Sequence, residues 1–247
     1  MKIDILTLIP GMFKNVFDES ILGAAVKNDI LSIETHSFRE FGDGRHKTVD
    51  DTAFGGGPGM ILKPGPLVEA IRDLRRQGNP GPVIGLTPQG VPFTQSVVRQ
   101  LAGFSRIILV CGRYEGFDER IRPEFDLEMS IGDYVLTGGE FPAMIVIDAV
   151  ARMLPGAVGC RESVEHDSFF TGPLDHPQFT RPPVWEGASV PEILTRGHHR
   201  MIEDWRRGKS LVRTAIRRPD VFSRLDLTTA DGAIFQECLN TAPGVEV

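Results

Sequence analysis

The residues from Ser130 to Pro142, Ser-Ile-Gly-Asp-Tyr-Val-Leu-Thr-Gly-Gly-Glu-Phe-Pro, have the types and spacing of a bend that binds a small ligand. Three glycines and a proline flank a short apolar run, so the backbone must turn sharply where side chains would obstruct it. An apolar helix is predicted to follow from Ala143 to Val150, with Pro142 in its first turn. The bend would expose backbone N–H and C=O groups to a ligand, although alone it is equally consistent with a tight structural turn.

Two further segments have the same character. Arg106–Cys111 is predicted to be a buried strand, and it runs directly into Gly112-Arg-Tyr-Glu-Gly116. The apolar run Val83–Leu86 is followed by Thr87-Pro-Gln-Gly90. In an open α/β sheet, the loops after the carboxyl ends of strands gather where ligands bind. We therefore expect the three loops to form one pocket, built mainly from main chain.

The common nucleotide-binding signatures are missing. Gly55-Gly-Gly-Pro-Gly59 has neither the GxGxxG spacing of a dinucleotide fold nor the terminal Lys-Ser/Thr of a phosphate-binding loop. Ile9-Pro-Gly-Met12, after the first predicted strand, offers one glycine and not the glycine-rich turn of a Rossmann methyltransferase. A pocket of another kind is required.

Several motifs occur in a fixed order over nearly the whole chain: Asp50–Met60, Cys111–Gly116, Ser130–Leu136 with Gly138–Glu140, Arg152 with Pro155-Gly156, Asp167-Ser-Phe169 and Ser210–Thr214. In these motifs the chain resembles the bacterial tRNA (guanine-37-N1)-methyltransferases, the TrmD family. The resemblance implies the SPOUT superfamily, in which S-adenosylmethionine (AdoMet) lies in a deep trefoil knot. The usual rules for chain connections exclude knots, so no periodicity in the sequence would predict one.

The resemblance assigns AdoMet binding to residues of all three loops: Leu86, Thr87, Pro88, Gly112, Ile131, Gly132, Asp133, Tyr134, Val135, Leu136, Gly138 and Gly139. Backbone groups of the bends would bind the adenine edge, while Ile131, Leu136 and Pro88 would contact its faces. Gly85 departs from the family, which has a larger and often aromatic residue there. We therefore expect looser contact around the cofactor at this point.

The resemblance also implies two catalytic residues, Asp167 and Arg152. Methyl transfer to guanine N1 requires loss of the N1 proton, so Asp167 is expected to act as the general base, a role worth ~10²–10⁴-fold in rate. Arg152 is expected to stabilise the negative charge that this step places on O6. Without the resemblance, Asp167 would be assigned as a turn cap and Arg152 as a cation at a helix C-terminus.

Further residues are expected to contact the substrate. Tyr114 and Glu115 would shape the guanine or methionine end of the pocket, and Lys209 and Arg213 belong to a basic region that would bind tRNA. Phe169 would stack on a base of the anticodon loop or, alternatively, anchor a linker. The family's activity is helped by Mg²⁺, yet no dedicated ligand set is evident. Magnesium would act through the substrate or through Glu115, and His198-His199 are predicted to be surface residues.

The distribution of charge matters more than its sum. The chain has 247 residues and a formal net charge of −6, which by itself argues against a nucleic-acid partner. From Arg196 to Arg224, however, nine basic residues accompany three acidic ones, and Trp205 lies among them. This region is suited to binding phosphate groups, and the alternative is a solvated helix face.

Cysteine content and hydropathy indicate the compartment. Cys111, Cys160 and Cys238 have no CxxC spacing, which argues against a disulfide framework or a zinc site and favours a reducing cytoplasm. No stretch approaches the ~18 consecutive apolar residues of a membrane span. Met1–Pro10 is predicted to contain a strand and not a signal peptide. We expect a cytoplasmic protein without a membrane partner.

The predicted elements alternate in the first part of the chain. Strands at Lys2–Ile9, Ile30–Thr35, Val83–Leu86 and Arg106–Cys111 alternate with helices at Met12–Lys27, Pro66–Gln77 and Thr94–Ala102. This order predicts an α/β fold, a parallel sheet with helices on both faces. The pattern stops between Cys160 and Pro183. Beyond it, helices are predicted at Ile193–Trp205 and at Leu211–Arg218, the second capped by Ser210 and ended by Pro219.

Three regions are therefore expected: a knotted AdoMet-binding catalytic domain (1–160), an interdomain linker (161–180) and a small helical tRNA-binding domain (181–247). The resemblance implies a homodimer that methylates N1 of guanosine 37 in tRNAs carrying G36-G37. The active site would lie at the subunit interface, so that Asp167 acts against the other subunit's cofactor. Two alternatives remain, a SPOUT methyltransferase acting on ribosomal RNA or on a ribose 2′-OH, and a non-catalytic RNA-binding protein.

Overall fold

A computed structural model describes residues 1–78, 81–159 and 164–240 of the chain. The chain divides into two compact units, Met1–Gly159 and Cys160–Val247, called unit 1 and unit 2 below. The domain boundary predicted between residues 160 and 161, and the first residues of the predicted linker, lie outside the described residues.

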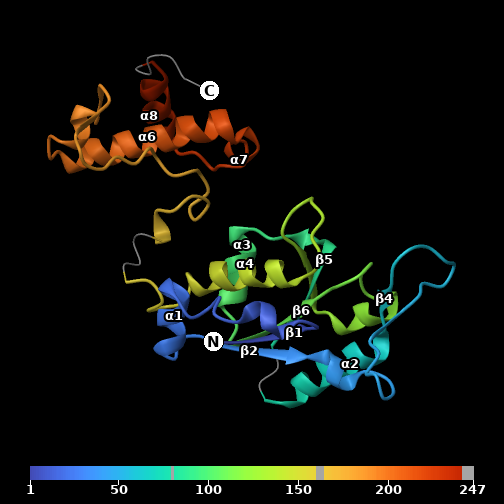
Figure 1. Ribbon diagram of the computed structural model, residues 1–247. Coiled ribbons are helices and arrows are strands. Elements are labelled where there is room, and N and C mark those ends of the chain that lie inside the picture. Colours follow the sequence, from blue (N-terminus) through green and yellow to red (C-terminus); the bar gives the residue numbers. More distant parts are fainter. Residues whose placement is uncertain (79–80, 160–163, 241–247) are drawn as a thin grey trace. The chain divides into compact units, whose positions relative to one another are not determined.

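Within the described residues, unit 1 is built around a five-stranded sheet with the strand order β2-β1-β6-β5-β7 (Figure 1). All neighbouring strands are parallel, which confirms the prediction. The strands are β1 (Lys2–Thr7), β2 (Ser32–Ser37), β5 (Val83–Pro92), β6 (Arg106–Cys111) and β7 (Leu127–Ser130). The strand β7 was not predicted, and β5 continues past the predicted end at Leu86, with a register shift between Leu86 and Val91.

Helices cover both faces of this sheet, as predicted (Figure 1). One face carries α1 (Ser20–Lys27), α3 (Gln95–Ala102) and α4 (Glu140–Ala151), and the other carries α2 (Pro64–Arg76) with the short 3₁₀ helices η2 (Phe38–Phe41) and η3 (Glu119–Glu124). The strand β6 shows the reason. Successive side chains of a strand point to opposite faces, so Ile107 and Leu109 join one buried cluster and Ile108 and Val110 the other.

The single helix predicted over Met12–Lys27 is wrong. A 3₁₀ helix, η1 (Pro10–Phe13), comes first, and α1 begins at Ser20. Asn15 and Ser20 have φ values of 65° and 59°, a left-handed conformation that a continuous right-handed helix cannot contain. Phe13 and Phe17 are buried nevertheless, with ring centroids 6.0 Å apart. The apolar spacing identified these two core residues but not the backbone between them, and Val16, on the same spacing, is 40% exposed.

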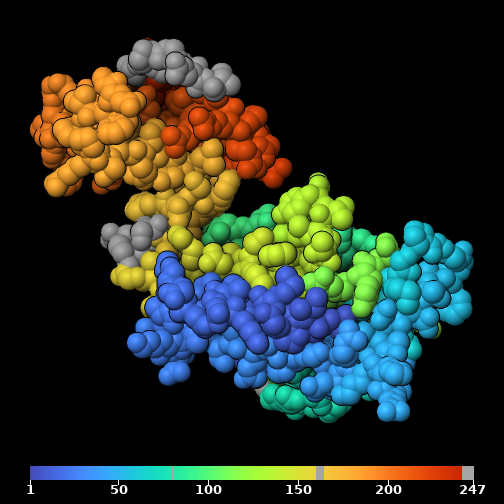
Figure 2. All heavy atoms as spheres, viewed as in Figure 1, coloured from blue at the N-terminus to red at the C-terminus, as the bar shows by residue number. Residues whose placement is uncertain are grey.

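A short antiparallel hairpin is formed by β3 (Asp50–Asp51) and β4 (Ile61–Leu62). Four glycines between these strands, Gly55, Gly56, Gly57 and Gly59, have positive φ, and Phe54 is fully exposed. The segment, light blue in Figure 2, projects from the body of unit 1. Its base joins the loop after β6, because the Glu115 N–H donates to the Met60 carbonyl at 2.9 Å.

Unit 2 contains the hairpin β8 (Val184–Trp185) and β9 (Ala188–Ser189), then η4 (Glu192–Leu194), α6 (His199–Arg217), α7 (Pro219–Phe222) and α8 (Thr229–Asn240). The helix α6 begins at His199 and not at the predicted Ile193. It then joins the two predicted helices into one, so the predicted cap at Ser210 is wrong. Ser210 lies inside α6, and its hydroxyl donates to the Leu174 carbonyl. The end of α6 just before Pro219 was predicted, and α8 was not. Within the described residues, no helix is both long and apolar enough to cross a bilayer.

Candidate functional site

A cavity of about 270 Å³ opens where the chain leaves β6 and β7, beside the register shift of β5. The three glycine-containing loops of the sequence analysis meet here. The predicted cofactor residues that line the cavity are Leu86, Thr87, Pro88, Gly112, Ile131, Gly132, Tyr134, Val135, Leu136, Gly138 and Gly139. Asp133 is not among the lining residues. Tyr114 and Glu115, predicted to contact the substrate, do line the cavity.

Glycine is required where two backbone segments meet at the floor of the cavity. The Gly139 N–H donates to the Gly112 carbonyl at 2.8 Å. A Cβ at Gly139 would lie only 2.6 Å from the Cα of Cys111, and one at Gly112 would lie 3.0 Å from the Phe117 ring. Side chains are therefore excluded from this crossing, and main-chain atoms form the surface that a ligand would meet.

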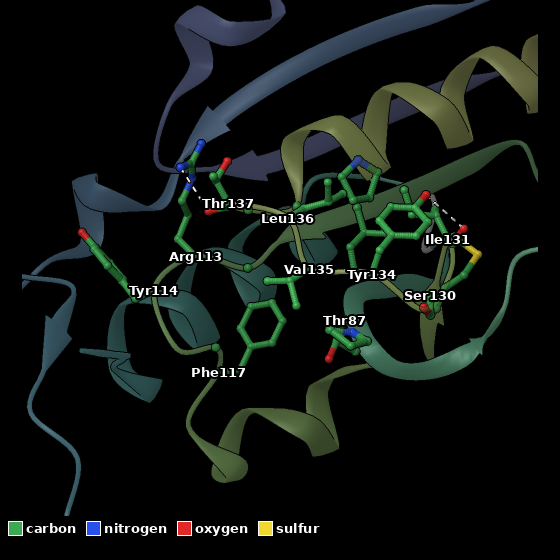
Figure 3. Close-up of a pocket in the computed structure, with 18 of the residues that line it drawn as sticks. Thr87, Arg113, Tyr114, Phe117, Ser130, Ile131, Tyr134, Val135, Leu136 and Thr137 are labelled. Atoms are coloured by element: carbon green, nitrogen blue, oxygen red, sulfur yellow. Dashed lines mark hydrogen bonds between the residues drawn. The ribbon is translucent and has the colours of Figure 1, made fainter. Parts of the chain in front are cut away.

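The walls of the cavity combine apolar side chains with a few polar contacts (Figure 3). Phe117, Val135 and Leu136 supply apolar surface. The Tyr134 hydroxyl donates to the Ile131 carbonyl at 3.3 Å, which closes the 131–134 turn on itself. Arg113 Nη1 donates to the Thr137 carbonyl at 3.3 Å and so joins the loop after β6 to the loop after β7. Tyr114, with φ of 60°, lies at one side of the cavity, apart from the Tyr134 ring (Figure 3).

A buried polar network supports these loops from below. Glu140, the first residue of α4, is 1% exposed, and its Oε1 accepts from Thr7 Oγ1 at 2.7 Å and from Arg113 Nε at 3.2 Å. Arg113 Nη2 lies 3.0 Å from Oε2. Because β1, the loop after β6 and α4 all contribute, the network fixes the end of each element beside the cavity. Glu140 lies within a predicted motif, but no function was predicted for it or for Thr7 and Arg113.

Cys111 is unsuited to be a nucleophile. Its thiol ends the buried strand β6, and burial, together with the nearby Glu140 carboxylate, raises its pKa well above the usual value. The neutral thiol is a poor nucleophile, since the thiolate is the reactive form. The cavity therefore offers binding and alignment, and no covalent intermediate at this residue.

One acidic group outside the cavity has the spacing of metal ligands. Within the described residues, Asp4, Glu34 and His36 bring ligand atoms within 4.8 Å of one another. Two cations already pair with the carboxylates of this group: Arg106 Nε donates to Asp4 at 2.7 Å, and Lys2 Nζ donates to Glu34 at 2.9 Å. Burial tends to raise the pKa of Asp4, but hydrogen bonds from His36 and Arg106 outweigh it and lower the pKa. The group acts as an ion-pair cluster at the sheet edge.

The space beside Gly85 is filled by an aromatic ring from another element. A Cβ at Gly85 would lie 2.7 Å from the ring of Phe125, which follows η3. Phe125 packs edge-on against Phe117, with ring centroids 5.2 Å apart, and Phe117 lines the cavity. Phe125 therefore occupies the space beside Gly85.

Arg152 does not lie at the cavity of its own chain. It is the C-terminal cap of α4, whereas the cavity lies at the opposite end of that helix, beside Gly139 and Pro142. The 12 residues of α4 span about 18 Å at 1.5 Å per residue. Within one chain, Arg152 and the cavity are therefore separated by about the length of α4.

The remaining predicted residues belong to unit 2. Asp167 lines a second cavity, of about 420 Å³, with Asp175, Glu203, Arg206 and Arg207 among its neighbours. Phe169 has a φ of 70°. The guanidinium carbon of Arg218 lies over the Phe169 ring, 5.6 Å from the ring centroid. Lys209 and Arg213 are half-buried on α6, and Arg213 Nη1 donates to the Asp175 carbonyl at 3.2 Å.

Comparisons with known proteins identify the family of the chain. Residues 1–224 match the family model described as tRNA (Guanine-1)-methyltransferase TrmD. Proteins named tRNA (guanine-N(1)-)-methyltransferase are similar over almost their full length: one from Dehalococcoides mccartyi is 52% identical over 97% of both chains, and one from Syntrophotalea carbinolica is 48% identical over 100% of both. One from Chloroflexus aggregans is 50% identical over 96% of this chain and 95% of its own. The chain therefore belongs to the tRNA (guanine-1) methyltransferase family, TrmD, and is a methyltransferase whose substrate is tRNA.

Proposed function

We propose that the chain transfers the methyl group of AdoMet to N1 of guanosine 37 in tRNAs that carry G36-G37, and that it does so in the cytoplasm, where tRNA is used. The observation that carries the proposal is the main-chain cavity around Gly112 and Gly139. The family implies a methyl donor, and AdoMet is the donor that we assign.

The residues of the cavity suit AdoMet. A Cβ at Gly139 would collide with the backbone of Cys111, so main chain packs directly on main chain beside the cavity. Leu136, Val135 and Phe117 offer apolar contact to ring faces, and turns of main chain offer donors and acceptors to ring edges. When bound, AdoMet supplies an electrophilic methyl group that needs only alignment with the accepting nitrogen. Magnesium is not assigned a site, and Glu115 is the carboxylate at the cavity through which it would act.

Two side chains carry the chemistry on guanine. Asp167 accepts the N1 proton, which frees the nitrogen lone pair for attack. Arg152 donates to O6 and stabilises the negative charge that forms there. Tyr114 and Phe169 offer aromatic surface to bases of the anticodon loop, and the cations of α6, including Lys209, bind its phosphates. Within unit 2, residues 181–247 are on this proposal the small helical tRNA-binding domain, and residues 161–180 are the linker that joins it to the catalytic domain.

The path of the chain supports a trefoil knot in unit 1. From β6, in the middle of the sheet, the chain passes beyond β5 to form β7, and it then returns to place Gly139 against Cys111. On this proposal the outgoing segment and the returning segment cross at the same edge of the sheet, which ordinary connections avoid. Threading one segment through the other gives the knot that we propose.

The surface of α4 supports a homodimer with shared active sites. Phe141 and Ile145, 50% and 46% exposed, lie on one stripe of the helix that continues through Asp148 to Arg152. Exposed apolar side chains in a row suit burial against a second copy. A two-fold axis across the stripe places the C-terminal end of one α4 beside the N-terminal end of the other. Arg152 of one subunit would thereby reach the cavity of its partner.

A methylation assay with G37 and A37 transcripts of one tRNA tests the proposal. We expect 1-methylguanosine from the G37 transcript and no product from A37. Asp167→Ala is expected to slow transfer by about 10²–10⁴-fold, while calorimetric titration still detects AdoMet. A product on ribosomal RNA or on ribose would favour the related SPOUT activities, and a chain that binds tRNA but not AdoMet would be a binding protein. Equal loss of AdoMet binding in Asp167→Ala would contradict its role as the base.

A further inference from the structure

Two buried hydroxyl groups of α6 form hydrogen bonds with the backbone carbonyl and the backbone N–H of a single residue, Leu174. Ser210 Oγ donates to the Leu174 carbonyl at 2.5 Å, and the Leu174 N–H donates to Thr214 Oγ1 at 2.9 Å. Thr214 Oγ1 also donates to the Ser210 carbonyl at 2.7 Å. Ser210 is 8% exposed and Thr214 0%. The two residues lie one helical turn apart, so their hydroxyls form a clamp on one face of the helix.

The segment held by this clamp is the far end of the loop that begins at Asp167. The Asp175 N–H donates to Ser168 Oγ at 2.9 Å, and the Phe169 N–H donates to the Pro173 carbonyl at 3.0 Å. The loop 167–175 is therefore closed on itself. Because Ser168 and Phe169 directly follow Asp167, the position of the Asp167 backbone depends on Leu174 and Asp175, and through them on α6.

The same helix carries cations toward the same place. Arg206 and Arg207 of α6 line the second cavity together with Asp167 and Ser210. Arg213, one position before Thr214, donates to the Asp175 carbonyl and reinforces the clamp. The helix α6 therefore carries the arginines suited to bind phosphate, and it also holds the loop of Asp167, the carboxylate suited to remove a proton.

We propose that Ser210 and Thr214 are positioning residues for Asp167, which fix its loop on the helix that binds tRNA. Docking of phosphates on α6 then sets the place of the general base relative to guanine. This inference rests on the proposed function, in which Asp167 is that base. Displacement of a catalytic group by about 1 Å costs on the order of 100-fold in rate, so a clamp of this kind affects the chemical step and not the binding of either substrate.

Thr214→Val tests the clamp because it removes the hydroxyl and retains the branched shape. In single-turnover methyl transfer to a G37 transcript, with both substrates saturating, we expect the rate to fall about 10- to 100-fold. The Kd values for AdoMet and for tRNA are expected to stay within about twofold of wild type. Thr214→Ser, which keeps the hydroxyl, restores the rate. Thr195→Val is the matched control, because the Thr195 hydroxyl contacts the Glu192 carbonyl in its own turn.

A double-mutant cycle separates positioning from general damage. Once Asp167 is replaced by alanine, no base remains to be positioned, so adding Thr214→Val should not slow the residual transfer further. An equal loss in both backgrounds would overturn the inference. Should Thr214→Val fold poorly, Ser210→Ala removes the other half of the clamp, and amide exchange of 168–175 is expected to rise while that of α8 does not.

The outcomes also separate the inference from the function on which it rests. If Asp167→Ala transfers methyl groups as fast as wild type, the proposed role of Asp167 fails. If Asp167→Ala is slow but both Thr214→Val and Ser210→Ala retain the wild-type rate and amide exchange, the clamp alone is refuted.

Discussion

Asp231 shows how one carboxylate joins two helices of unit 2. Its Oδ2 accepts from the N–H and the hydroxyl of Thr228, while its own N–H donates to Thr228 Oγ1, a reciprocal cap at the start of α8. Its Oδ1 accepts from Arg207 Nε of α6 at 2.6 Å. The hydrogen bond from Arg207, aided by those from Thr228, lowers the pKa of Asp231 to about 2.

The lowered pKa predicts how stability depends on pH. The pKa of Asp231 is lower in the folded chain than the ordinary 3.8, so its contribution is complete above that value and is lost as pH falls from about 4 to about 2. Asp231→Asn removes this contribution. The difference in the free energy of unfolding between wild type and Asp231→Asn, measured in urea, should therefore shrink over that interval. A difference that stays constant between pH 5 and pH 3 would show that Asp231 does not titrate in this way.

At the scale of elements, the contact between α6 and α8 explains a failure of local pattern. Gly208 and Ser210 resemble a helix stop followed by a new cap, yet α6 runs through both. A Cβ at Gly208 would collide with Cys238 Sγ of α8, so the glycine serves the approach of a second helix. Local sequence does not contain this tertiary reason. The same holds for Asn15 and Ser20, whose left-handed backbone divides an apolar pattern of helical spacing.

Two glycine substitutions test the helix contact. Gly208→Ala is expected to lower the free energy of unfolding by about 1–3 kcal/mol, because the methyl group overpacks the α6–α8 contact. Gly232→Ala in α8 is the matched control, since its Cβ would meet no atom within 4 Å. That change should raise stability by about 0.5–1 kcal/mol through helix propensity. Denaturant unfolding measures the free energy of unfolding of both variants. Equal changes in that free energy would show that α8 does not pack against α6 as described.

Much of the cavity was predictable because its signal is local. The strand β6 is a continuous apolar run ended by Gly112, and glycines mark each bend that reaches the cavity. The network beneath it was not predictable. Thr7 and Glu140 lie 133 positions apart, and nothing near either residue indicates the other. The strand β7 has only four residues, too few for a pattern of alternation, and it is placed by its pairing with β5.

At the scale of the whole molecule, the length of α4 separates two parts of one proposed site. Arg152 caps one end and the cavity lies at the other. If each active site combines the cavity of one subunit with Arg152 of the next, then defects in different subunits should complement each other. A site made within one chain would show no such complementation.

Mixed dimers distinguish these arrangements. Arg152→Ala and Leu136→Glu, the second placing a charge in the apolar wall of the cavity, are each expected to be inactive as pure dimers. After unfolding and joint refolding, random pairing gives mixed dimers in half of the population, and one of the two sites in each is intact. We expect about a quarter of the wild-type rate of methyl transfer. Failure of the mixture to regain activity, with mixed dimers present by native mass spectrometry, would assign both residues to one subunit's site.

The backbone at Tyr114 and Phe169 carries one more consequence. Both residues adopt the left-handed conformation that glycine tolerates and bulky side chains resist, at a cost of about 1–2 kcal/mol each. Glycine at either position would relax the chain but delete an aromatic side chain that, on the proposed function, contacts a base of the anticodon loop. If both rings contact the anticodon loop as proposed, stability and activity favour different residues at these two positions, and a variant stabilised by glycine there would methylate tRNA more slowly.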